Sequence, residues 1–521
     1  MYLDSDANYM GIKDYVKFVR TNYSASCRKH WYSRYTDLYV DVNHILHHVC
    51  YTSQTTDEIL KKLRSYLMEL IATYRPTKRI YIAADGTAPV AKMLLQRKRR
   101  YEKVKTLSKV DELKMSQNLA LNFTPGTEFM LGLANELQYF KSFIEITYAV
   151  KVILDIESVD EGEIKVRRQI GKDCARKNFR GAVYSGDADM ILLLVSLETR
   201  YLQNIYQIVN RDTVISLGQL ITAHKEKYCP DSEVTDQAMR NDFIFLNLLL
   251  GNDYLPKVSY LKPENIWAAY SKLIRKYEDG LISYDKAEQT ITIDQMFMTD
   301  LIFAASSMNK LNYDKKFTFA TNNASLNREY VEGLAWCFDM YSTGVCSDYR
   351  YFYKHKSAPH YNALALEVMT NNFHQVASSE PVDTQLYGIL LIPEKADTLL
   401  TESQREISNT LTDTHPIIHE VERCQKCTAF SKKLSKFNKE IKELRAESSV
   451  SDRNTYDPLD DSSDDASDDS VMSEETKTRH REDLLEKVRN TSELFNAHRE
   501  THNVMNIRHI ESIEKSYRTL V

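Results

Sequence analysis

The sequence predicts an α/β fold, in which a parallel sheet is covered by helices on both faces. Short apolar runs rich in β-branched residues end in a carboxylate at 38–41, 80–85 and 183–187. Amphipathic stretches alternate with these runs, which is the pattern of buried parallel strands between helices. In such a sheet the ligand site lies beyond the carboxyl ends of the strands, where these acids fall.

Composition indicates an intracellular protein that does not bind membranes. The chain has 521 residues, 43% of them hydrophobic, and a formal net charge of −5. The stretch 452–475 holds ten acidic residues and one arginine, so the rest of the chain is mildly basic at about +4. No apolar run reaches the roughly 18 residues that cross a bilayer, and the start is acidic. We expect a cytoplasmic rather than nuclear protein, whose eight scattered cysteines are free thiols.

Changes in composition divide the chain into four expected parts. They are an N-terminal α/β domain at 1–270, a helical connection at 271–325, a second block rich in aromatic residues at 326–420, and a charged tail at 421–521. The first and third parts carry all the motifs described below. We therefore expect the third part to complete a site that begins in the first.

The tail has both helical and unstructured character. An apolar residue recurs every three or four positions of a Lys/Glu-rich stretch, at Phe430, Leu434, Phe437, Ile441 and Leu444. This spacing predicts a short coiled-coil or docking helix, through which a protein partner could bind. The Ser/Asp tract after it lacks the apolar surface to fold and should be disordered. A final polar helix is expected from about Arg481.

Seven carboxylates stand out by their local context. They are Asp41, Asp85, Glu161, Glu163, Asp187, Asp189 and Asp253. In the pairs at 161/163 and 187/189, a spacing of two would place both side chains on one side of an extended chain, where they repel unless a cation lies between them. Two divalent cations supply that charge and can cleave a phosphodiester. Oxygen ligands without a matching His/Cys set favour Mg²⁺ or Mn²⁺ over zinc.

Each of these acids also has a structural interpretation, because Asp and Glu after strands are common N-caps and turn residues. For one acid alone the two interpretations are about equally supported. For all seven together the structural interpretation is weaker. Asp253 lies in Gly251-Asn-Asp-Tyr-Leu-Pro256, after the apolar segment 243–250, and a turn needs only one Asn or Asp there.

Seven motifs occur in a fixed order. They are Asp41-Val-Asn-His-Ile-Leu-His47, Asp85-Gly-Thr-Ala-Pro-Val-Ala-Lys-Met93, Thr124-Pro-Gly-Thr-Glu-Phe-Met130, Glu161-Gly-Glu-Ile-Lys165, Asp187-Ala-Asp189, Gly251-Asn-Asp-Tyr-Leu-Pro256 and the block 330–359. Together they resemble the motifs of the Xrn-type 5′→3′ exoribonucleases over about residues 10–420. Each motif alone is weak, and the ordered set is highly specific.

The resemblance implies a PIN-like nuclease core related to that of the flap endonucleases. The seven acids would bind two Mg²⁺ or Mn²⁺ ions and serve as the catalytic residues. The implied reaction is stepwise hydrolysis of single-stranded RNA with a 5′-monophosphate to nucleoside monophosphates, in RNA decay or processing. We expect the enzyme to act as a monomer.

The resemblance also assigns a basic helix to the terminal phosphate. After Pro89, which suits a first helical turn, four donors share one helix face. They are Lys92, Gln96, Arg99 and Arg100. Four donors on one face can surround a phosphate, to which arginine offers fork geometry. The alternative is a solvated basic face, which the adjoining Asp85 motif makes the minority interpretation.

Aromatic stacking on the RNA bases is less well defined. The resemblance implies that His47 stacks on the first base, a contact that needs no sequence preference. Where the family has a Trp-rich string, this chain has Asp348-Tyr-Arg-Tyr-Phe-Tyr-Lys-His355. Tyr349 or Tyr351 is therefore the candidate for the stacking partner. The alternative is that these are core aromatics.

Two other function classes remain open. A DNA-directed 5′ nuclease of the flap endonuclease type shares the acids but lacks both the block 330–359 and the Lys92 set. A catalytically silent RNA-binding scaffold is disfavoured because all seven acids are intact. A zinc site could be assembled from His415, His419, Cys424 and Cys427 on spacing alone. We do not predict one, because a single Cys-x-x-Cys pair is a weak signal.

Overall fold

The computed structural model describes residues 15–106, 119–308, 324–370, 378–419, 429–443, 474–501 and 505–521, apart from 33, 260, 286–289, 356, 431 and 442. Two compact units are present, Met1–Ile407 and Ser408–Val521. The strands are β1 (Cys27–Arg28), β2 (Asp37–Asp41), β3 (Arg79–Ala83), β4 (Lys151–Asp155), β5 (Gly181–Tyr184), β6 (Ile205–Asn210), β7 (Thr213–Ser216), β8 (Ile282–Asp285) and β9 (Thr290–Ile293).

The helices of the first unit alternate with the strands along the chain. They are α1 (Tyr15–Asn22), α2 (Val42–Cys50), α3 (Thr56–Tyr74), α4 (Val90–Thr106), α6 (Glu128–Tyr148), α7 (Gly162–Asp173), α8 (Asp189–Val195), α9 (Thr199–Leu202), α10 (Leu217–Tyr228), α11 (Asp236–Leu248), α12 (Pro263–Leu273), α13 (Gln295–Ser307), α14 (Ala324–Thr343), α15 (Tyr361–Thr370) and α16 (Thr384–Leu391). The helix α17 (Glu402–Thr414) spans the boundary between the units.

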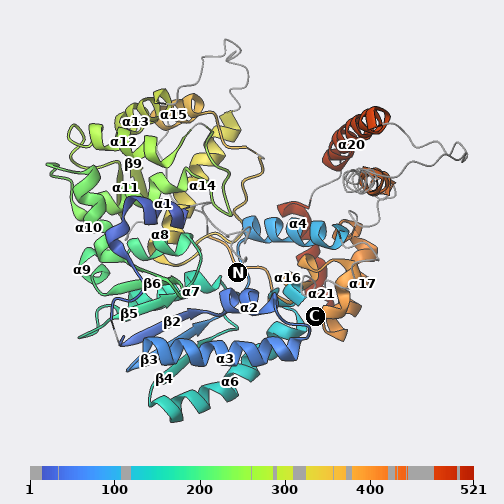
Figure 1. Ribbon diagram of the computed structural model, residues 1–521, viewed down its shortest axis with the longest axis horizontal. Helices are drawn as coiled ribbons and strands as arrows, with labels where there is room; N and C mark the ends of the chain where they lie inside the picture. Colours follow the sequence, from blue (N-terminus) through green and yellow to red (C-terminus); the bar gives the residue numbers. More distant parts are fainter. Residues whose placement is uncertain are drawn as a thin grey trace, which may run out of the picture. The chain divides into compact units, whose positions relative to one another are not determined.

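A seven-stranded sheet lies at the centre of the first unit, in the order β1-β7-β6-β5-β2-β3-β4 (Figure 1). The strands β6, β5, β2, β3 and β4 run parallel, and β7 and β1 are antiparallel to their neighbours. The three predicted strands are β2, β3 and β5, with β2 paired to both of the others. The acids that follow these strands therefore lie at the same edge of the sheet, and the predicted α/β fold is confirmed.

Alternating side chains of the strands enter two separate cores. Leu38 and Val40 of β2 pack in one cluster with residues of α3 and α6, such as Leu63 and Leu137. Tyr39, between them, belongs to a second cluster with residues of α7, α8 and α10. Figure 1 shows α3 and α6 on one face of the sheet and α7 and α8 on the other. Burial on both faces explains why the strands are apolar without a polar face.

The expected helical connection at 271–325 is wrong in part, because it contains a β-hairpin. The strands β8 and β9 pair antiparallel between helices α12 and α13. In these strands Ile282, Tyr284, Ile291 and Ile293 are buried and alternate with exposed or half-exposed residues. That period of two over four residues is short, which is why a weak sequence signal concealed it. Residues 309–323 lie outside the described part of the chain.

A buried histidine, His224 of α10, should make the first unit sensitive to acid. Its Nδ1 lies 2.8 Å from the Tyr23 hydroxyl, and its ring packs on Trp267 and Phe243. Burial, together with the positive charge of Lys227, lowers the pKa of His224 to about 3. Below about pH 6.5 the unfolded chain binds a proton that the folded protein does not bind, so stability falls as the pH falls toward 3.

We expect His224→Asn to flatten this fall, since asparagine keeps a hydrogen-bonding group near Nδ1 and cannot be protonated. The difference in slope should approach about 1.4 kcal/mol per pH unit below pH 6. Urea unfolding of both proteins at a series of pH values measures it. The variant starts from a lower stability because the smaller side chain leaves a cavity, so only the slope is diagnostic. Parallel slopes would show that His224 does not carry the effect.

The second unit has more helical structure than we predicted. The polar helix expected from about Arg481 is confirmed as α20 (Glu474–Thr501), and residues 432–441 are also helical. An additional helix, α21 (Ile507–Leu520), begins at Asn506, whose side chain accepts a hydrogen bond from the N–H of His509. Leu444 and the Ser/Asp tract, including its predicted disorder, lie outside the described residues.

The six cysteines within the described ranges are free thiols, as predicted. Cys424 and Cys427 lie outside those ranges. No described helix has the length and apolar character needed to cross a membrane.

Candidate active site

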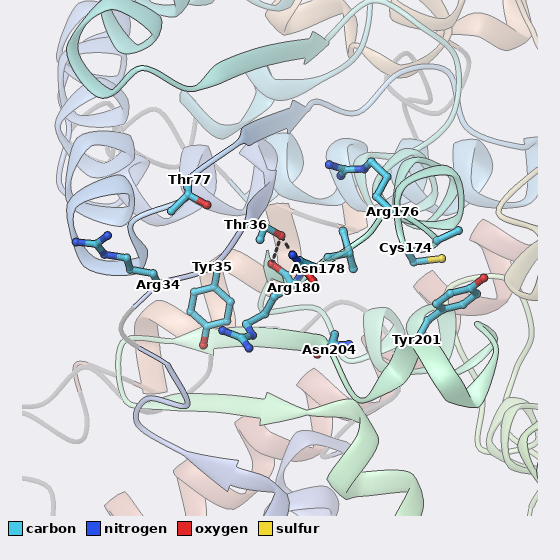
Figure 2. Close-up of a pocket in the computed structure, with 12 residues that line it drawn as sticks. Arg34, Tyr35, Thr36, Thr77, Cys174, Arg176, Asn178, Arg180, Tyr201 and Asn204 are labelled. Carbon is cyan, nitrogen blue, oxygen red and sulfur yellow. Dashed lines mark hydrogen bonds between the residues drawn. The ribbon is translucent and has the colours of Figure 1, made fainter.

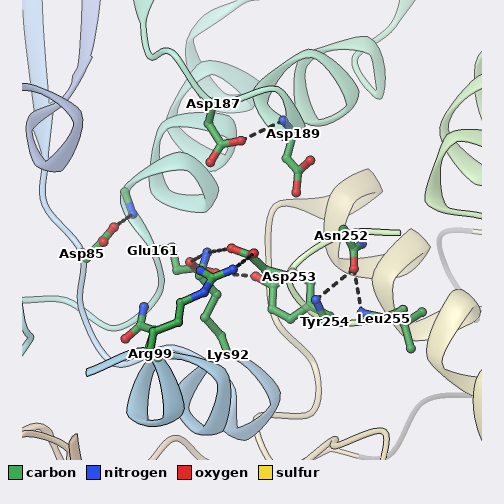
Figure 3. A network of polar contacts seen from close by, with 12 residues as sticks. Asp85, Lys92, Arg99, Glu161, Asp187, Asp189, Asn252, Asp253, Tyr254 and Leu255 are labelled. Atoms are coloured by element: carbon green, nitrogen blue, oxygen red, sulfur yellow. Dashed lines mark hydrogen bonds and ion pairs between the residues drawn. The ribbon is translucent and has the colours of Figure 1, made fainter. Parts of the chain in front are cut away.

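Three of the predicted acids are placed directly by the sheet. Asp41 is the last residue of β2, Asp85 follows β3 by two residues, and Asp187 follows β5 by three. Because these strands are parallel neighbours, their carboxyl ends bring the three carboxylates to one edge. Figure 3 shows Asp187 and Asp189 pointing toward a group formed by Glu161, Lys92 and Asp253.

The two acidic pairs come together for a different reason from the one we predicted. Neither pair lies wholly in extended chain, although Glu161 itself has extended backbone angles. Glu161 is the N-cap of α7 and Glu163 lies in its first turn, while Ala188 has helical backbone angles and Asp189 begins α8. Two helix N-termini therefore present these acids to the edge of the sheet, where the N-terminal dipole favours negative charge.

Backbone N–H groups hold two of the carboxylates. Asp41 Oδ1 accepts from the N–H of Asn43 at 3.0 Å and, as the N-cap of α2, from that of His44 at 3.4 Å. Asp85 Oδ1 accepts from the N–H of Gly162 at 2.8 Å. A Cβ atom at position 162 would lie 3.1 Å from Asp41 Oδ1 and 3.5 Å from Asp85 Oδ1. The glycine between the two glutamates therefore allows α7 to approach both aspartates closely.

Lys92 occupies the centre of the acids rather than the surface of its helix. Its side chain is only 2% exposed, and its Nζ contacts Glu161 Oε1 and lies 2.8 Å from Asp253 Oδ2. Burial alone would lower the pKa of Lys92, but the charges of Asp253 and Glu161 outweigh burial and raise it. Arg99 Nη2 lies 3.2 Å from Asp253 Oδ1. Asp253 is thus shared by two cations, which lower its pKa despite burial.

Sequence reasoning missed two tyrosines that hold acids of the site. The Tyr254 hydroxyl donates to Glu161 Oε2, and the Tyr341 hydroxyl donates to Asp189 Oδ2 at 2.8 Å. Both hydroxyls are buried. Tyr254 lies within the Gly251 motif, but Tyr341 lies at the end of α14, in the second block, with no pattern to mark it. Through Tyr341 the block at 326–420 contacts the acid cluster.

The cluster holds more negative charge than its cations neutralise. Burial raises the pKa of both Glu163 and Asp187, and repulsion adds to it, from Asp187 on Glu163 and from Asp189 on Asp187. Burial and the charge of Asp85 raise the pKa of Asp41 to about 7. Crowded carboxylates that resist losing their protons are typical of functional sites and of cation sites.

The donor chemistry fits a hard divalent cation, although the side chains do not already enclose one. Carboxylate oxygens are the ligands that Mg²⁺ and Mn²⁺ prefer. Among the described residues, no three His, Cys, Asp or Glu side chains converge as a ready-made metal site. Part of the reason is that the Lys92 ammonium lies between Glu161 and Asp253. Cation binding at this point would require these side chains to rearrange.

The remaining members of the predicted phosphate set form a polar cluster on α4. Arg100 Nε donates to Thr124 Oγ1 at 2.8 Å and Arg100 Nη1 to Gln96 Oε1 at 3.1 Å, while the Tyr387 hydroxyl also donates to Gln96, at 3.3 Å. In the described chain no carboxylate pairs with Arg100. Burial lowers the pKa of this guanidinium to about 10. Arg100 is half-buried, and a partly desolvated cation with only neutral hydrogen-bond partners is an attractive position for an anion.

The predicted stacking residues differ in accessibility. His47 of α2 is exposed and packs edge-to-face on Phe123 at 5.2 Å. The Tyr349 ring is buried, and its hydroxyl donates to Asp160, so the structure favours the alternative of a core aromatic there. Tyr351 is half-buried, stacks on Trp336 at 4.7 Å and donates to the Glu329 carbonyl. His47 and Tyr351 remain the candidates for stacking.

The histidines of the excluded zinc site have other surroundings. His415 Nε2 lies 2.9 Å from Ser516 Oγ, and His419 is buried. Cys424 and Cys427 fall in a part of the chain that the structure does not describe.

A parallel α/β sheet with acids crowded at its carboxyl edge, beside a basic helix, defines the class of this protein as an α/β protein with a nuclease-like acidic site. Residues 10–206 match the family model described as "XRN 5'-3' exonuclease N-terminus". This N-terminal region of the chain is therefore similar to the corresponding region of the Xrn-type family.

Several curated proteins are similar to part of this chain. The chain is 28% identical over 295 residues to 5'-3' exoribonuclease 1 of Saccharomyces cerevisiae, which covers 48% of this chain and 19% of the relative. It is 26% identical over 305 residues to 5'-3' exoribonuclease 1 of Homo sapiens, covering 48% and 18%. It is 28% identical over 264 residues to 5'-3' exoribonuclease 2 of Schizosaccharomyces pombe, covering 43% and 26%. The match spans about a fifth to a quarter of these relatives.

Solved structures with similar folds include the catalytic core of Rad2 in complex with DNA substrate. That structure is 12% identical, with a TM-score of 0.30 and coverage of 75% of this chain and 98% of the other. The T5 D15 protein co-crystallized with metal ions is 11% identical, with a TM-score of 0.29 and coverage of 72% and 97%. Scores this low carry no argument about function.

Proposed function

We propose that this protein is a divalent-metal-dependent 5′→3′ exoribonuclease acting on single-stranded RNA with a 5′-monophosphate. The observation that carries the proposal is that a cluster of carboxylates lies next to a helix that bears positive charge. Seven carboxylates crowd one sheet edge, and the adjoining helix α4 bears Arg100, a half-buried cation for which no carboxylate partner is described. The names of the curated relatives support RNA as the substrate and 5′→3′ as the direction.

The seven acids would hold the metal, as two Mg²⁺ or Mn²⁺ ions. A bound cation supplies Lewis-acid charge at the scissile phosphate and lowers the pKa of water. Neighbouring residues of the chain orient the carboxylates and set their charge. Tyr254 and Tyr341 each donate a hydrogen bond to one carboxylate oxygen, of Glu161 and of Asp189, and so orient these two carboxylates. Lys92 and Arg99 keep Asp253 ionised.

The position of the phosphate cluster would set direction. Gln96 and Arg100 lie on the same helix as Lys92, four and eight residues further on, so they share its face. A terminal phosphate held there leaves the next phosphodiester near the acids. After cleavage the new 5′-phosphate can occupy the same cluster, so one recognition element gives both direction and processivity.

One assay tests the proposal against its alternatives. Purified protein and Mg²⁺ are incubated with matched 5′-phosphate RNA, 5′-hydroxyl RNA, capped RNA and 5′-phosphate single-stranded DNA, each labelled at the 3′ end. We expect stepwise release of mononucleotides from 5′-phosphate RNA only. Faster cleavage of the DNA would indicate the DNA-directed nuclease instead. Binding without cleavage of any substrate would indicate the silent scaffold.

Tyr341→Phe tests the carboxylate-positioning role proposed here. The change removes one hydroxyl from Asp189 and leaves the ring in place. A charge-assisted hydrogen bond contributes about 1.5–3 kcal/mol, so we expect Mn²⁺ affinity to weaken by roughly 10-fold or more. Calorimetry without RNA measures the affinity, independently of activity. Tyr330→Phe is the matched control, since that buried hydroxyl of α14 donates to the Pro256 carbonyl. Equal Mn²⁺ affinity in both variants would contradict the role.

A further inference from the structure

The edge of the sheet opposite the acids carries unusual positive charge. Three loops, at 31–36, 75–78 and 174–180, lead into the amino ends of the strands β2, β3 and β5, and the last turn of α7 at 172–173 precedes the third loop. Their cations are Arg34, Arg75, Lys78, Lys172, Arg176, Lys177 and Arg180. Lys151, the first residue of β4, adds one more positive charge at this edge. We call this set the basic edge.

Two carboxylates near the basic edge, Asp37 and Asp173, are already neutralised. Asp173 lies 2.8 Å from Arg79 Nη1 and 3.3 Å from Arg176 Nε, and the Tyr39 hydroxyl donates to it. Asp37, at the start of β2, lies 2.7 Å from Arg176 Nη2. Both carboxylates are buried. Within the described chain the other cations of the three loops make no ion pair, so their charge faces solvent or the cavity described next.

A cavity of about 650 Å³ opens among these loops, and Figure 2 shows its lining. Three guanidinium groups belong to the lining, those of Arg34, Arg176 and Arg180. Two tyrosines also belong to the lining, the half-buried Tyr201 and Tyr35, whose ring is buried and is not available for stacking. The Arg180 guanidinium also lies 3.9 Å from the centroid of the Tyr32 ring, which is 40% exposed.

We propose that the basic edge is a second binding surface for single-stranded RNA, separate from the active site. Cations without acidic partners bind a phosphate backbone through release of counterions, and interleaved aromatic rings can stack on bases. Rings and unpaired cations occur together here, which favours nucleic acid over an acidic peptide. The inference rests on the proposed function, because the bound RNA would be a distal part of the substrate.

The surface would hold the 3′ portion of a long RNA whose 5′ end is in the active site. The two sites lie at opposite ends of the same strands, so only an RNA long enough to pass around the sheet can engage both. A second contact raises the effective concentration of the substrate at the first. Long RNA should therefore bind more tightly than short RNA of the same 5′ end.

The test is a triple variant, Arg34→Gln, Lys78→Gln and Lys177→Gln, which removes three exposed charges. The control is Lys61→Gln, Lys262→Gln and Lys272→Gln, three exposed lysines on α3 and at α12. Fluorescence anisotropy in EDTA measures the affinity of each protein for 5′-phosphate RNA of about 8 and about 30 nucleotides over a range of salt. We expect the triple variant to bind the long RNA roughly tenfold more weakly, with the salt slope reduced by about 2.

Cleavage of the short RNA separates this inference from the proposed function. We expect the triple variant to cleave the short RNA at the unchanged rate. In a separate experiment, 4-thiouridine in the 3′ half of the long RNA should cross-link to wild-type peptides that contain residues 31–36 or 172–180. If no protein cleaves the short RNA, the proposed function fails, whatever the affinities are. If the triple variant and the control bind the long RNA equally, the basic edge is not an RNA surface. If the triple variant loses affinity for an acidic peptide and keeps its affinity for the long RNA, the basic edge binds a protein partner instead.

Discussion

Asp187→Asn is expected to abolish cleavage of 5′-phosphate RNA while RNA binding in EDTA remains. Asparagine keeps the Oδ1 atom that accepts the Asp189 N–H at 3.0 Å, so the local backbone is preserved. What is lost is one negative oxygen of the proposed metal site. Metal-ion stabilisation of the transition state amounts to several kcal/mol, so the rate should fall by about three orders of magnitude. Single-turnover cleavage of end-labelled RNA in Mg²⁺ measures the loss.

The same variant should have the opposite effect on stability in EDTA. Burial and the charge of Asp189 raise the pKa of Asp187, which means that its ionised form is unfavourable in the metal-free fold. Removing that charge should raise the thermal unfolding temperature in EDTA and reduce the further rise that Mn²⁺ produces. Glu157→Gln, an exposed acid after β4, is the control. A variant that is inactive and also less stable in EDTA would indicate damage to the fold rather than loss of a ligand.

Arg100→Ala should show the largest dependence on the 5′ group of the substrate. Arg100 is half-buried beside Gln96 and Thr124 with only neutral hydrogen-bond partners, so a terminal phosphate would be its first anionic hydrogen-bond partner. Losing a charged hydrogen bond of about 1.5–3 kcal/mol should lower kcat/KM on 5′-phosphate RNA by about 10- to 150-fold. The effect on 5′-hydroxyl RNA should be much smaller.

Lys98→Ala is the matched control for Arg100, because it removes one exposed charge from the same helix. Its effect should be small and equal on both RNAs, as expected of a general electrostatic contact. Arg99→Ala should differ from both. Arg99 lies 3.2 Å from Asp253 and competes with a metal ion for that carboxylate, so Arg99→Ala should also strengthen metal binding. If Arg100→Ala reduces cleavage of both RNAs equally, α4 is a backbone-binding surface and not a 5′-phosphate site.

Local sequence patterns leave two features of the site undetermined, the backbone conformation of the acidic pairs and the burial of Lys92. The pairs at 161/163 and 187/189 were assigned to extended chain, whereas helix N-termini present them. A spacing of two is compatible with both conformations, so it identifies the residues and not their backbone. The resemblance and helical periodicity together place Lys92 in a phosphate pocket, a role that stays a prediction. Periodicity gives the face of the helix, but it does not show that the face is buried against Glu161 and Asp253.

The sequence by itself determined the class of the sheet and the identity of the acids. Apolar runs ending in carboxylates need only local pattern, because strand burial and the edge to which parallel strands deliver their last residues follow from it. Tertiary structure decided which groups balance those acids. Tyr341 is 152 residues from Asp189 in the chain, and the basic edge gathers three loops. Local patterns do not encode such distant contacts, since they depend on the packing of the whole sheet.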